Sequence, residues 1–544
     1  MIRVLVVLGL LSTLPVFGHA GPADPTPLLE AVQEHIRTRV ETQRRDLASL
    51  RVTLADRSVM QFYQDRAFGP IWIDETGPRP AATALLETLR GASDHGLRPA
   101  DYHTAEIDSL LSRLQSLAQS PGKIDPQMAA TFELLCTDAF LLYGYHLLTG
   151  RTSPTTIDPT WNLQGRRADL LSILDAASTS GRVQAALLDL APPQPEYQTL
   201  QAALERYRSL KEAGGWPAVP EGPTLQPGEA SPRVPALRAR LQAGEDLSPA
   251  DAPVDTASAD SVDVYDPALQ IAVERFQDRH GLEVDGVVGP ATLRALNVPA
   301  AQRLDQILVN LERWRWLPND LGRRHVLVNI AAFRMSVVEN GSDVLSMRVI
   351  AGKPYRQTPV FTGQMSYLVF NPYWHVPHSI ATKDKLPAIQ KDPSYLTNQK
   401  VEVFRGWSAK ATPIDPATID WSQLSKTHFP YRLRQAPGPL NALGRVKFMF
   451  PNPHSVYLHD TPTRGLFARA ERSFSSGCIR VERPAALAEY VLADHPDWTP
   501  ERIRETMQVK DPDEQTVRLL EKLPVHLLYW TAWVDDGTVA FRQD

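Results

Sequence analysis

Cysteine is almost absent from this sequence, which holds two, Cys136 and Cys478, among 544 residues. Two cysteines so far apart do not build a disulfide framework, so the fold has to rest on ordinary hydrophobic cores. A strong net charge is also missing, because 57 basic residues stand against 62 acidic ones, and this balance gives no reason to expect a nucleic-acid partner. Hydrophobic residues make up 43% of the chain, which is enough for several packed domains. We expect Cys136 to be one of the buried core residues.

The hydrophobic run at the start of the chain is short. Val4 to Phe17 is apolar over about 14 residues, whereas a membrane span needs roughly 20. A positive start, Met1-Ile2-Arg3, precedes this run, and the small residues Gly18-His19-Ala20 follow it. The pattern is typical of a secretory signal peptide, so we expect residues 1–20 to direct export and then to be removed. The alternative is that the run is retained as an inner-membrane anchor.

The candidate chemistry lies in residues 457–483, YLHDTPTRGLFARAERSFSSGCIRVER. Cys478 follows two serines and a glycine, and His459 lies nineteen positions upstream. A thiol that attacks a carbonyl needs a base, and imidazole has a suitable pKa near neutral pH. Main-chain N–H groups near Gly477 and Cys478 could bind an oxyanion, and Arg480 would favour the thiolate. By chemistry alone, a nucleophile and an inert buried residue are equally acceptable interpretations of Cys478.

The order of residues around His459 and Cys478 favours the nucleophile over the inert buried residue. His459-Asp460-Thr461, followed by Ser475-Ser476-Gly477-Cys478-Ile479-Arg480-Val481, closely resembles the active-site motif of L,D-transpeptidases with a YkuD-type catalytic domain. Many members carry a second histidine where this chain has Ser476, so the resemblance is to the larger, YcbB-like branch. It implies that Cys478 is the nucleophile and that His459 is the general base and acid.

The same motif supplies candidates for supporting roles. Gly477, Ser476 and Asp460 are expected to stabilise the oxyanion or to orient the histidine. Arg480 and Tyr457 are expected to contact substrate. Each also has a structural interpretation: Asp460 and Ser476 as turn formers, Tyr457 as a packing residue, and Arg480 as the partner of a nearby carboxylate. No metal site is expected, because the cysteine and histidine lack further ligands.

The sequence predicts mostly helices in the first three hundred or so residues of the chain. Residues 21–57 form an N-terminal segment, and residues 58–227 show helical apolar spacing and resemble the scaffold domain of the larger L,D-transpeptidases. Residues 228–298 combine helices with the strings FQDRHGL, DGVVG and TLRALN, and they resemble a three-helix peptidoglycan-binding module. The alternative for that region is a plain helical spacer. Residues 299–323 predict a connecting helix.

From residue 324 onward the hydrophobic period becomes that of strands. Short apolar runs between Gly and Pro turns predict a mostly β, sandwich-like catalytic domain over 324–534, with 525–534 as a long final strand and 535–544 as a C-terminal tail. The strand pattern lapses over about 378–432, where we expect an inserted subdomain of helices and loops. In the family this position carries a lid over the active site, and the alternative is an insertion without function. The fold class predicted is therefore α+β and multidomain.

The resemblance implies a periplasmic enzyme that needs no cofactor and acts on peptidoglycan. Its partners would be donor and acceptor stem peptides, glycan strands bound by 228–298, and other wall-synthesis enzymes, with no nucleic acid. Cys478 would attack the bond between the L-centre of a diamino acid and a terminal D-alanine, or a carbapenem, and a second stem would complete a cross-link. Water or a lipoprotein lysine as acceptor would instead give an L,D-carboxypeptidase, an endopeptidase or an anchoring enzyme. A wall-binding protein with an inert cysteine is the non-catalytic alternative.

Overall fold

The computed structural model describes residues 27–42, 56–119, 123–157, 161, 163, 165–248, 263–406, 408, 411–510 and 512–543. The chain divides into two compact units, which are described separately. The first comprises Met1–Ala92, Arg98–Gly144 and Asp169–Leu188, and the second comprises Ser93–Leu97, Tyr145–Ala168 and Asp189–Asp544. The expected export signal, residues 1–20, lies outside the described residues. Within the described part of the chain, every helix is too short or too polar to cross a lipid bilayer.

The first unit is helical, as the apolar spacing predicts. It contains most of the long helix α5 (Pro126–Thr149), which is buried along much of its length. The other elements are α1 (Pro27–Thr42), α2 (Asp56–Asp65), β1 (Ile73–Asp74), β2 (Gly77–Pro78), α3 (Pro80–Arg90), α4 (Thr104–Ala118), α7 (Leu170–Ser180) and α8 (Val183–Leu188). Cys136 lies on α5 with no exposed surface, and burial raises the pKa of its thiol well above the ordinary value. The expectation that Cys136 is a core residue is therefore confirmed.

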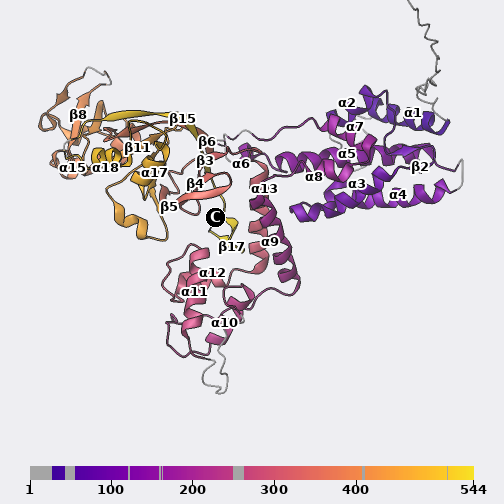
Figure 1. The fold of residues 1–544 in the computed structure, drawn as a ribbon, viewed down its shortest axis with the longest axis horizontal. Coiled ribbons are helices and arrows are strands. Elements are labelled where there is room, and N and C mark those ends of the chain that lie inside the picture. The colour runs from indigo at the N-terminus through magenta and orange to yellow at the C-terminus, as the bar shows by residue number, and fades with distance from the viewer. Residues whose placement is uncertain are drawn as a thin grey trace, which may run out of the picture. The chain divides into compact units, whose positions relative to one another are not determined.

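A pair of helices and a three-helix module begin the second unit. Helices α9 (Pro195–Glu212) and α13 (Ala300–Arg315) lie side by side (Figure 1). Trp314 of α13 stacks on Trp530 with 4.4 Å between ring centroids. Helices α10 (Val234–Ala243), α11 (Pro267–Arg279) and α12 (Pro290–Leu296) surround their own apolar core. The Asp266 side chain caps α11 by accepting a 2.8 Å hydrogen bond from the Leu269 N–H. The short helix α6 (Pro154–Ile157) also belongs to this unit.

The region predicted to be catalytic is built on a nine-stranded sheet within the described residues, in the order β13-β5-β14-β12-β11-β6-β15-β3-β4. Because β4 also pairs with β5, the hydrogen-bonded ladder closes into a ring instead of forming two separate sheets of a sandwich. The long strand β5 makes this possible, since its first half pairs with β4 and its end pairs with β14 and β13. The strands are β3 (Arg324–Asn329), β4 (Arg334–Glu339), β5 (Ser342–Gly352), β6 (Phe361–Phe370), β11 (Val446–Met449), β12 (Leu458–His459), β13 (Ser473–Ser475), β14 (Ile479–Val481) and β15 (Gln515–Leu528). Helices α17 (Pro484–Val491) and α18 (Pro500–Gln508) follow β14 in the chain.

The sequence predicts only helices and loops for the inserted region. The structure also has a four-stranded sheet there, in the order β7-β10-β8-β9. Its strands alternate buried and polar positions, as in β10, where Tyr431, Leu433 and Gln435 are buried. Arginines between these residues, and the short length of each strand, hide the pattern in the sequence. The elements are β7 (Trp374–His375), α14 (His378–Ile380), the π-helical η6 (Ala381–Lys385), α15 (Leu386–Lys391), α16 (Tyr395–Asn398), β8 (Val401–Arg405), β9 (Pro413–Ile414) and β10 (Tyr431–Gln435). A separate apolar cluster forms the core of this subdomain.

The end of the chain also differs from the prediction. The long strand expected over 525–534 stops at Leu528, and a hairpin of β16 (Ala532–Asp535) and β17 (Thr538–Phe541) follows it. Part of the expected tail is therefore a strand that packs against other elements of its unit. The Phe541 ring stacks on His280 at the end of α11, and the Arg279 side chain donates to the Val539 carbonyl. These tertiary contacts order a segment whose sequence is too short and mixed to indicate a hairpin.

Candidate active site

Strands β12 and β14 bring the predicted nucleophile and base to one face of the sheet. The two strands pair in parallel, with Leu458 opposite Ile479 and His459 opposite Arg480. Leu458 and Ile479 are completely buried in the core, so the residues that alternate with them project from the other face. Cys478 lies two residues before Arg480, the residue that pairs with His459. With spacings of about 4.8 Å between strands and 3.3 Å per residue, the Cα atoms of His459 and Cys478 are roughly 8 Å apart. The imidazole ring can extend across such a diagonal toward the shorter cysteine side chain.

Tyr457 lies beside both groups. Its ring is 5.7 Å from the His459 ring, edge to face. Its main chain and its hydroxyl both act on the Cys478 sulfur and lower the pKa of the thiol. The Ile479 N–H donates to the Tyr457 carbonyl over 3.1 Å, which keeps Tyr457 level with the cysteine. Tyr457 therefore joins the imidazole and the thiol in one constellation.

His459 is held as a neutral, oriented imidazole. It is only 4% exposed, and its Nδ1 lies 2.5 Å from the main-chain oxygen of Asp460. A carbonyl can only accept, so Nδ1 carries the proton and Nε2 is left as the acceptor. Burial, followed by the positive charge of Arg480, lowers the pKa of His459 to about 3, against hydrogen bonds to the main chain of Asp460 and Leu443. The ring is therefore uncharged near neutral pH, as a base must be.

Cys478 is partly exposed and rests as a thiol. Burial of the sulfur raises its pKa, and the two Tyr457 groups and the charge of Arg480 offset only part of this effect. The sulfur also lies 3.8 Å from the Ser455 carbonyl, to which the thiol can donate. A neutral thiol next to a neutral imidazole needs proton transfer at the moment of attack, in contrast to a preformed ion pair.

The turn before the cysteine depends on two residues. Gly477 has a φ of +115°, a backbone conformation that favours glycine. Ser475 braces the turn: its hydroxyl donates to the Cys478 carbonyl over 2.5 Å and accepts from the Gly477 N–H over 3.1 Å. The Gly477 N–H is thus already engaged, although the sequence predicts it as an oxyanion donor. Ser475 is a residue that the sequence interpretation missed, although it belongs to the quoted motif.

The carboxylate of Asp460 does not contact His459. Its oxygens accept from the N–H groups of Arg445 and Thr461 over 2.8 and 2.6 Å, and they pair with Arg464 at 2.5 Å. The main-chain carbonyl of Asp460, not its side chain, is the group that orients the histidine. The carboxylate instead fixes the loop that carries this carbonyl.

Arg480 has no carboxylate partner in the described part of the chain. Glu482, a candidate partner, pairs with Arg348, and Asp460 pairs with Arg464. The Nη1 of Arg480 lies 3.5 Å from the Thr463 hydroxyl, and its Nε is buried with no hydrogen-bond partner among the described residues. A partly buried guanidinium with spare donors is suited to a carboxylate ligand.

Ser476 contacts the inserted subdomain through an arginine. The Ser476 hydroxyl is exposed and accepts a 2.8 Å hydrogen bond from Nη1 of Arg356. The same guanidinium donates from Nη2 to Asp384 of η6 over 2.9 Å. The sequence interpretation missed Arg356 and Asp384, because nothing local connects either residue to the motif. Together they link the nucleophile turn to the insertion.

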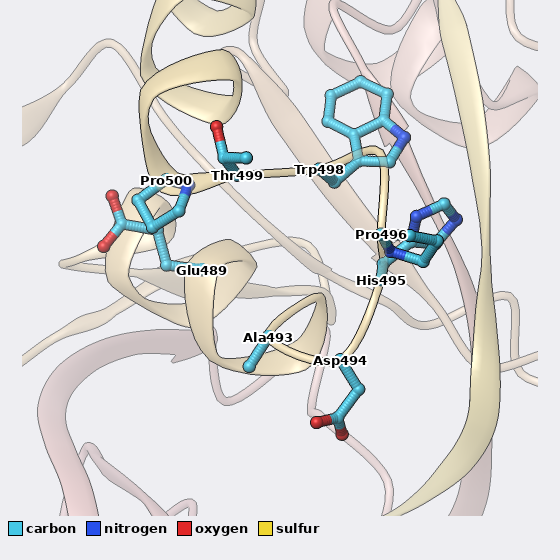
Figure 2. Close-up of a pocket in the computed structure, with 8 residues that line it drawn as sticks. All are labelled: Glu489, Ala493, Asp494, His495, Pro496, Trp498, Thr499 and Pro500. Atoms are coloured by element: carbon cyan, nitrogen blue, oxygen red, sulfur yellow. The ribbon is translucent and has the colours of Figure 1, made fainter.

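A surface hollow of about 420 Å³ lies elsewhere on this domain (Figure 2). It is formed by α17, the start of α18 and the loop between them, including Trp498, and the residues that line it include none of the motif discussed above. The predicted nucleophile, base and supporting residues are therefore not part of this hollow.

The described geometry defines an α+β protein with a cysteine, an oriented histidine and an unpaired arginine on one sheet face. Family models match three parts of the chain: the L,D-transpeptidase catalytic domain of the YkuD family at residues 323–512, a scaffold domain at 57–204, and a provisionally described peptidoglycan binding domain at 231–296. The chain therefore carries a catalytic domain of the YkuD L,D-transpeptidase family together with a peptidoglycan-binding domain and a scaffold domain.

Curated relatives cover parts of the chain. A Haemophilus influenzae protein, named provisionally as an L,D-transpeptidase, is 36% identical over 239 residues, which are 44% of this chain and 47% of that protein. An N-acetylmuramoyl-L-alanine amidase of Mycobacterium tuberculosis is 38% identical over 76 residues, which are 14% of this chain and 19% of that protein. The chain thus spans less than half the length of these relatives.

The solved structure of an L,D-transpeptidase from Stackebrandtia nassauensis is 14% identical and covers 57% of this chain and 96% of its own, with a TM-score of 0.21. This score is too low to support a fold assignment, which rests on the strand pairing described above.

Proposed function

We propose that this protein is an L,D-transpeptidase that cross-links peptidoglycan stem peptides through a cysteinyl acyl-enzyme on Cys478. The observation that carries the proposal is the neutral, oriented imidazole of His459 on the same sheet face as the thiol, within a domain of this family. Because the acceptor nitrogen of the ring is unprotonated, it can remove a proton when the sulfur attacks.

The reaction has two halves, formation of the acyl-enzyme and transfer of the acyl group to the acceptor. Each half includes two proton transfers. The Cys478 sulfur attacks the carbonyl carbon between the L-centre of a diamino acid and the terminal D-alanine, while Nε2 of His459 takes the thiol proton. The tetrahedral intermediate collapses, the C–N bond breaks, and His459 returns the proton to the departing D-alanine amine. The amine of a second stem then attacks the thioester and gives its proton to His459. Breakage of the C–S bond forms the cross-link, and the proton returns to the sulfur.

The oxyanion needs donors close to the sulfur. With the Gly477 N–H held by Ser475, the candidates are the Cys478 N–H and the Tyr457 hydroxyl, which already lies beside the sulfur. Gly477 then contributes the shape of the turn, and Ser476 contributes the contact with Arg356. Arg480 would bind a carboxylate of the donor stem with its unpaired donors.

The inserted subdomain favours cross-linking over hydrolysis. It has its own core and is joined to the nucleophile turn through Arg356, so it is placed to cover a bound donor and to exclude water. The peptidoglycan-binding domain would hold glycan strands, which requires export of the protein to the periplasm. Attachment of a lipoprotein and simple hydrolysis use the same acyl-enzyme and differ only in the acceptor.

Intact-mass measurement tests the proposal. Incubation with a tetrapeptide-bearing muropeptide should give an adduct equal to the muropeptide minus D-alanine, and a carbapenem should add its own mass. Absence of both adducts in a folded protein would contradict the proposed function. Analysis of wall fragments from cells that express the enzyme separates the outcomes: cross-links between third residues support transpeptidation, and tripeptides alone indicate hydrolysis.

The loop beneath Asp460 offers a first mutational prediction. Gly444 has a φ of +62°, and a Cβ at this position would lie 2.3 Å from the Asp460 carboxyl carbon. Gly444→Ala must therefore displace Asp460, and with it the carbonyl that orients His459. We expect the rate of acyl-enzyme formation to fall by about tenfold or more, because catalysis is sensitive to shifts of about 1 Å. Stopped-flow acylation by a carbapenem measures this rate.

Gly406→Ala is the matched control for this prediction. Gly406 also has a positive φ of +76°, but no atom lies within 4 Å of the place a Cβ would occupy. Both variants carry the backbone cost of roughly 1–2 kcal/mol for a left-handed alanine, and only Gly444→Ala adds the clash. Equal acylation rates for the two variants would show that the Asp460 loop does not position the base.

A further inference from the structure

Lys447 stands in one row with the proposed base and with Arg480. Lys447 on β11 pairs directly with His459 on β12, and His459 pairs with Arg480 on β14. Directly opposed residues in a ladder project from the same face, so the three side chains form a row on the face that carries Cys478. Adjacent strands lie about 4.8 Å apart, which places one cation on each side of the imidazole.

The ammonium of Lys447 is left without a partner. It is partly buried, and it makes no hydrogen bond or ion pair with any residue that the structure describes. Burial lowers the pKa of Lys447, and the opposite charge that acts on it is the Glu514 carboxylate, which accepts from the Tyr373 N–H over 2.7 Å. A desolvated charge without a partner costs free energy, and an anionic ligand would recover it.

The inserted subdomain adds positive charge on the same side. Strand β7 places His375 opposite Arg434 of β10, and Nη1 of Arg432 lies 3.5 Å from Nδ1 of His375. Burial lowers the pKa of His375, and the charges of Arg432, Arg434 and Lys447 lower it further, whereas the Glu514 carboxylate raises it. Glu402 neutralises Arg434 at 2.7 Å, so Arg432 and Lys447 are the cations around His375 that have no ion pair with a described residue. The surroundings of Lys447 thus favour an anion.

The reaction chemistry identifies this anion, given the proposed function on which the inference rests. His459 protonates the departing amine of D-alanine, and the carbon that bears this amine also bears a carboxylate. A cation next to His459 is therefore within reach of that carboxylate. The attacking amine of the acceptor must enter at the position from which the D-alanine amine departs. This amine is on the second centre of the acceptor's diamino acid, and the carbon that bears it also bears a carboxylate. A lysine side-chain amine has no such group.

We propose that Lys447 is a specificity residue that binds the α-carboxylate of the amino-acid unit on the amine side of the reaction. It holds D-alanine as this group leaves, and it holds the acceptor's α-amino carboxylate as this group enters. Arg480 lies on the strand that continues from Cys478, so it faces the acyl donor. Arg480 therefore binds the donor's carboxylate on one side of His459, and Lys447 binds the carboxylate of D-alanine or of the acceptor on the other side.

An exchange assay tests this assignment. The enzyme is incubated with an unlabelled tetrapeptide muropeptide and ¹³C-labelled D-alanine, or with labelled D-alaninamide, which lacks the carboxylate. Incorporation is followed by mass spectrometry. The wild type should have a KM for D-alanine at least tenfold below that for the amide. Lys447→Met should raise the KM for D-alanine at least tenfold with kcat retained, and it should leave the KM for the amide unchanged.

The controls separate charge from structure. Lys447→Arg keeps the charge and should keep the preference for the acid, and Lys522→Met on the exposed part of β15 should change neither KM. Equal use of acid and amide by the wild type overturns the assignment without any variant, as does an equal rise of both KM values in Lys447→Met. If the wild type forms no acyl-enzyme at all, the proposed function fails and this assignment fails with it.

Discussion

Replacement of Cys478 by alanine is expected to abolish acyl-enzyme formation with both the muropeptide and a carbapenem. The described site offers no second thiol, because Cys136 lies fully buried on α5 with a raised pKa. A loss on the order of 10⁴-fold or more is typical when a nucleophile is removed from a catalytic unit. The side chain is small and partly exposed, so the thermal unfolding temperature should change little. Intact-mass spectra with and without substrate measure the effect.

Two controls accompany this variant. Cys478→Ser keeps the shape of the site but has a far weaker nucleophile, and it should also show no adduct. Cys136→Ala should lose some stability, because it leaves a small cavity in the helical unit, and it should still be acylated at the wild-type rate. Persistence of the adduct, or of full cross-linking, in Cys478→Ala would rule out the proposed mechanism.

The parts of the site that could be predicted are those encoded by neighbouring residues. The alternation of Leu458 and Ile479 with polar residues places His459 and Cys478 on one face once the two strands pair. The Asp266 cap of α11 is likewise a local feature, because Pro267 follows it at the first helical position. Local propensity and the apolar period therefore suffice for many of the elements and for the face on which His459 and Cys478 lie, and their roles as base and nucleophile stay predictions.

The parts that could not be predicted depend on contacts between distant segments. Closure of the sheet requires β5 to pair with both β4 and β14, and the contact of Arg356 with Ser476 and Asp384 joins three separate segments. The orientation of His459 by a main-chain carbonyl is also hidden, because every residue has such a group. Lys447 becomes a candidate only when the register of β11 against β12 is known.

Replacement of His459 by glutamine is the second change with a large expected effect. Glutamine can still donate to the Asp460 carbonyl, but it cannot take a proton, so acylation by the muropeptide should fall by about 10²–10⁴-fold. Alkylation of Cys478 by iodoacetamide at neutral pH should change little, because the resting pair is a neutral thiol and a neutral imidazole. A large fall in alkylation would show instead that His459 stabilises a resting thiolate.

The pH dependence of acylation tests the role of His459 further, because the direction of the expected shift follows from the pKa of the ring. A base with the ordinary pKa of histidine would lose function below about pH 6.5. Burial and Arg480 lower the pKa of His459 to about 3, so kcat/KM for acylation should hold well below pH 6.5 in the wild type. Arg480→Met removes a positive charge beside the ring, which raises the pKa of His459 and should move the acid limb to higher pH. An acid limb near pH 6.5 in both proteins would mean that the base which titrates in the free enzyme is not the buried imidazole.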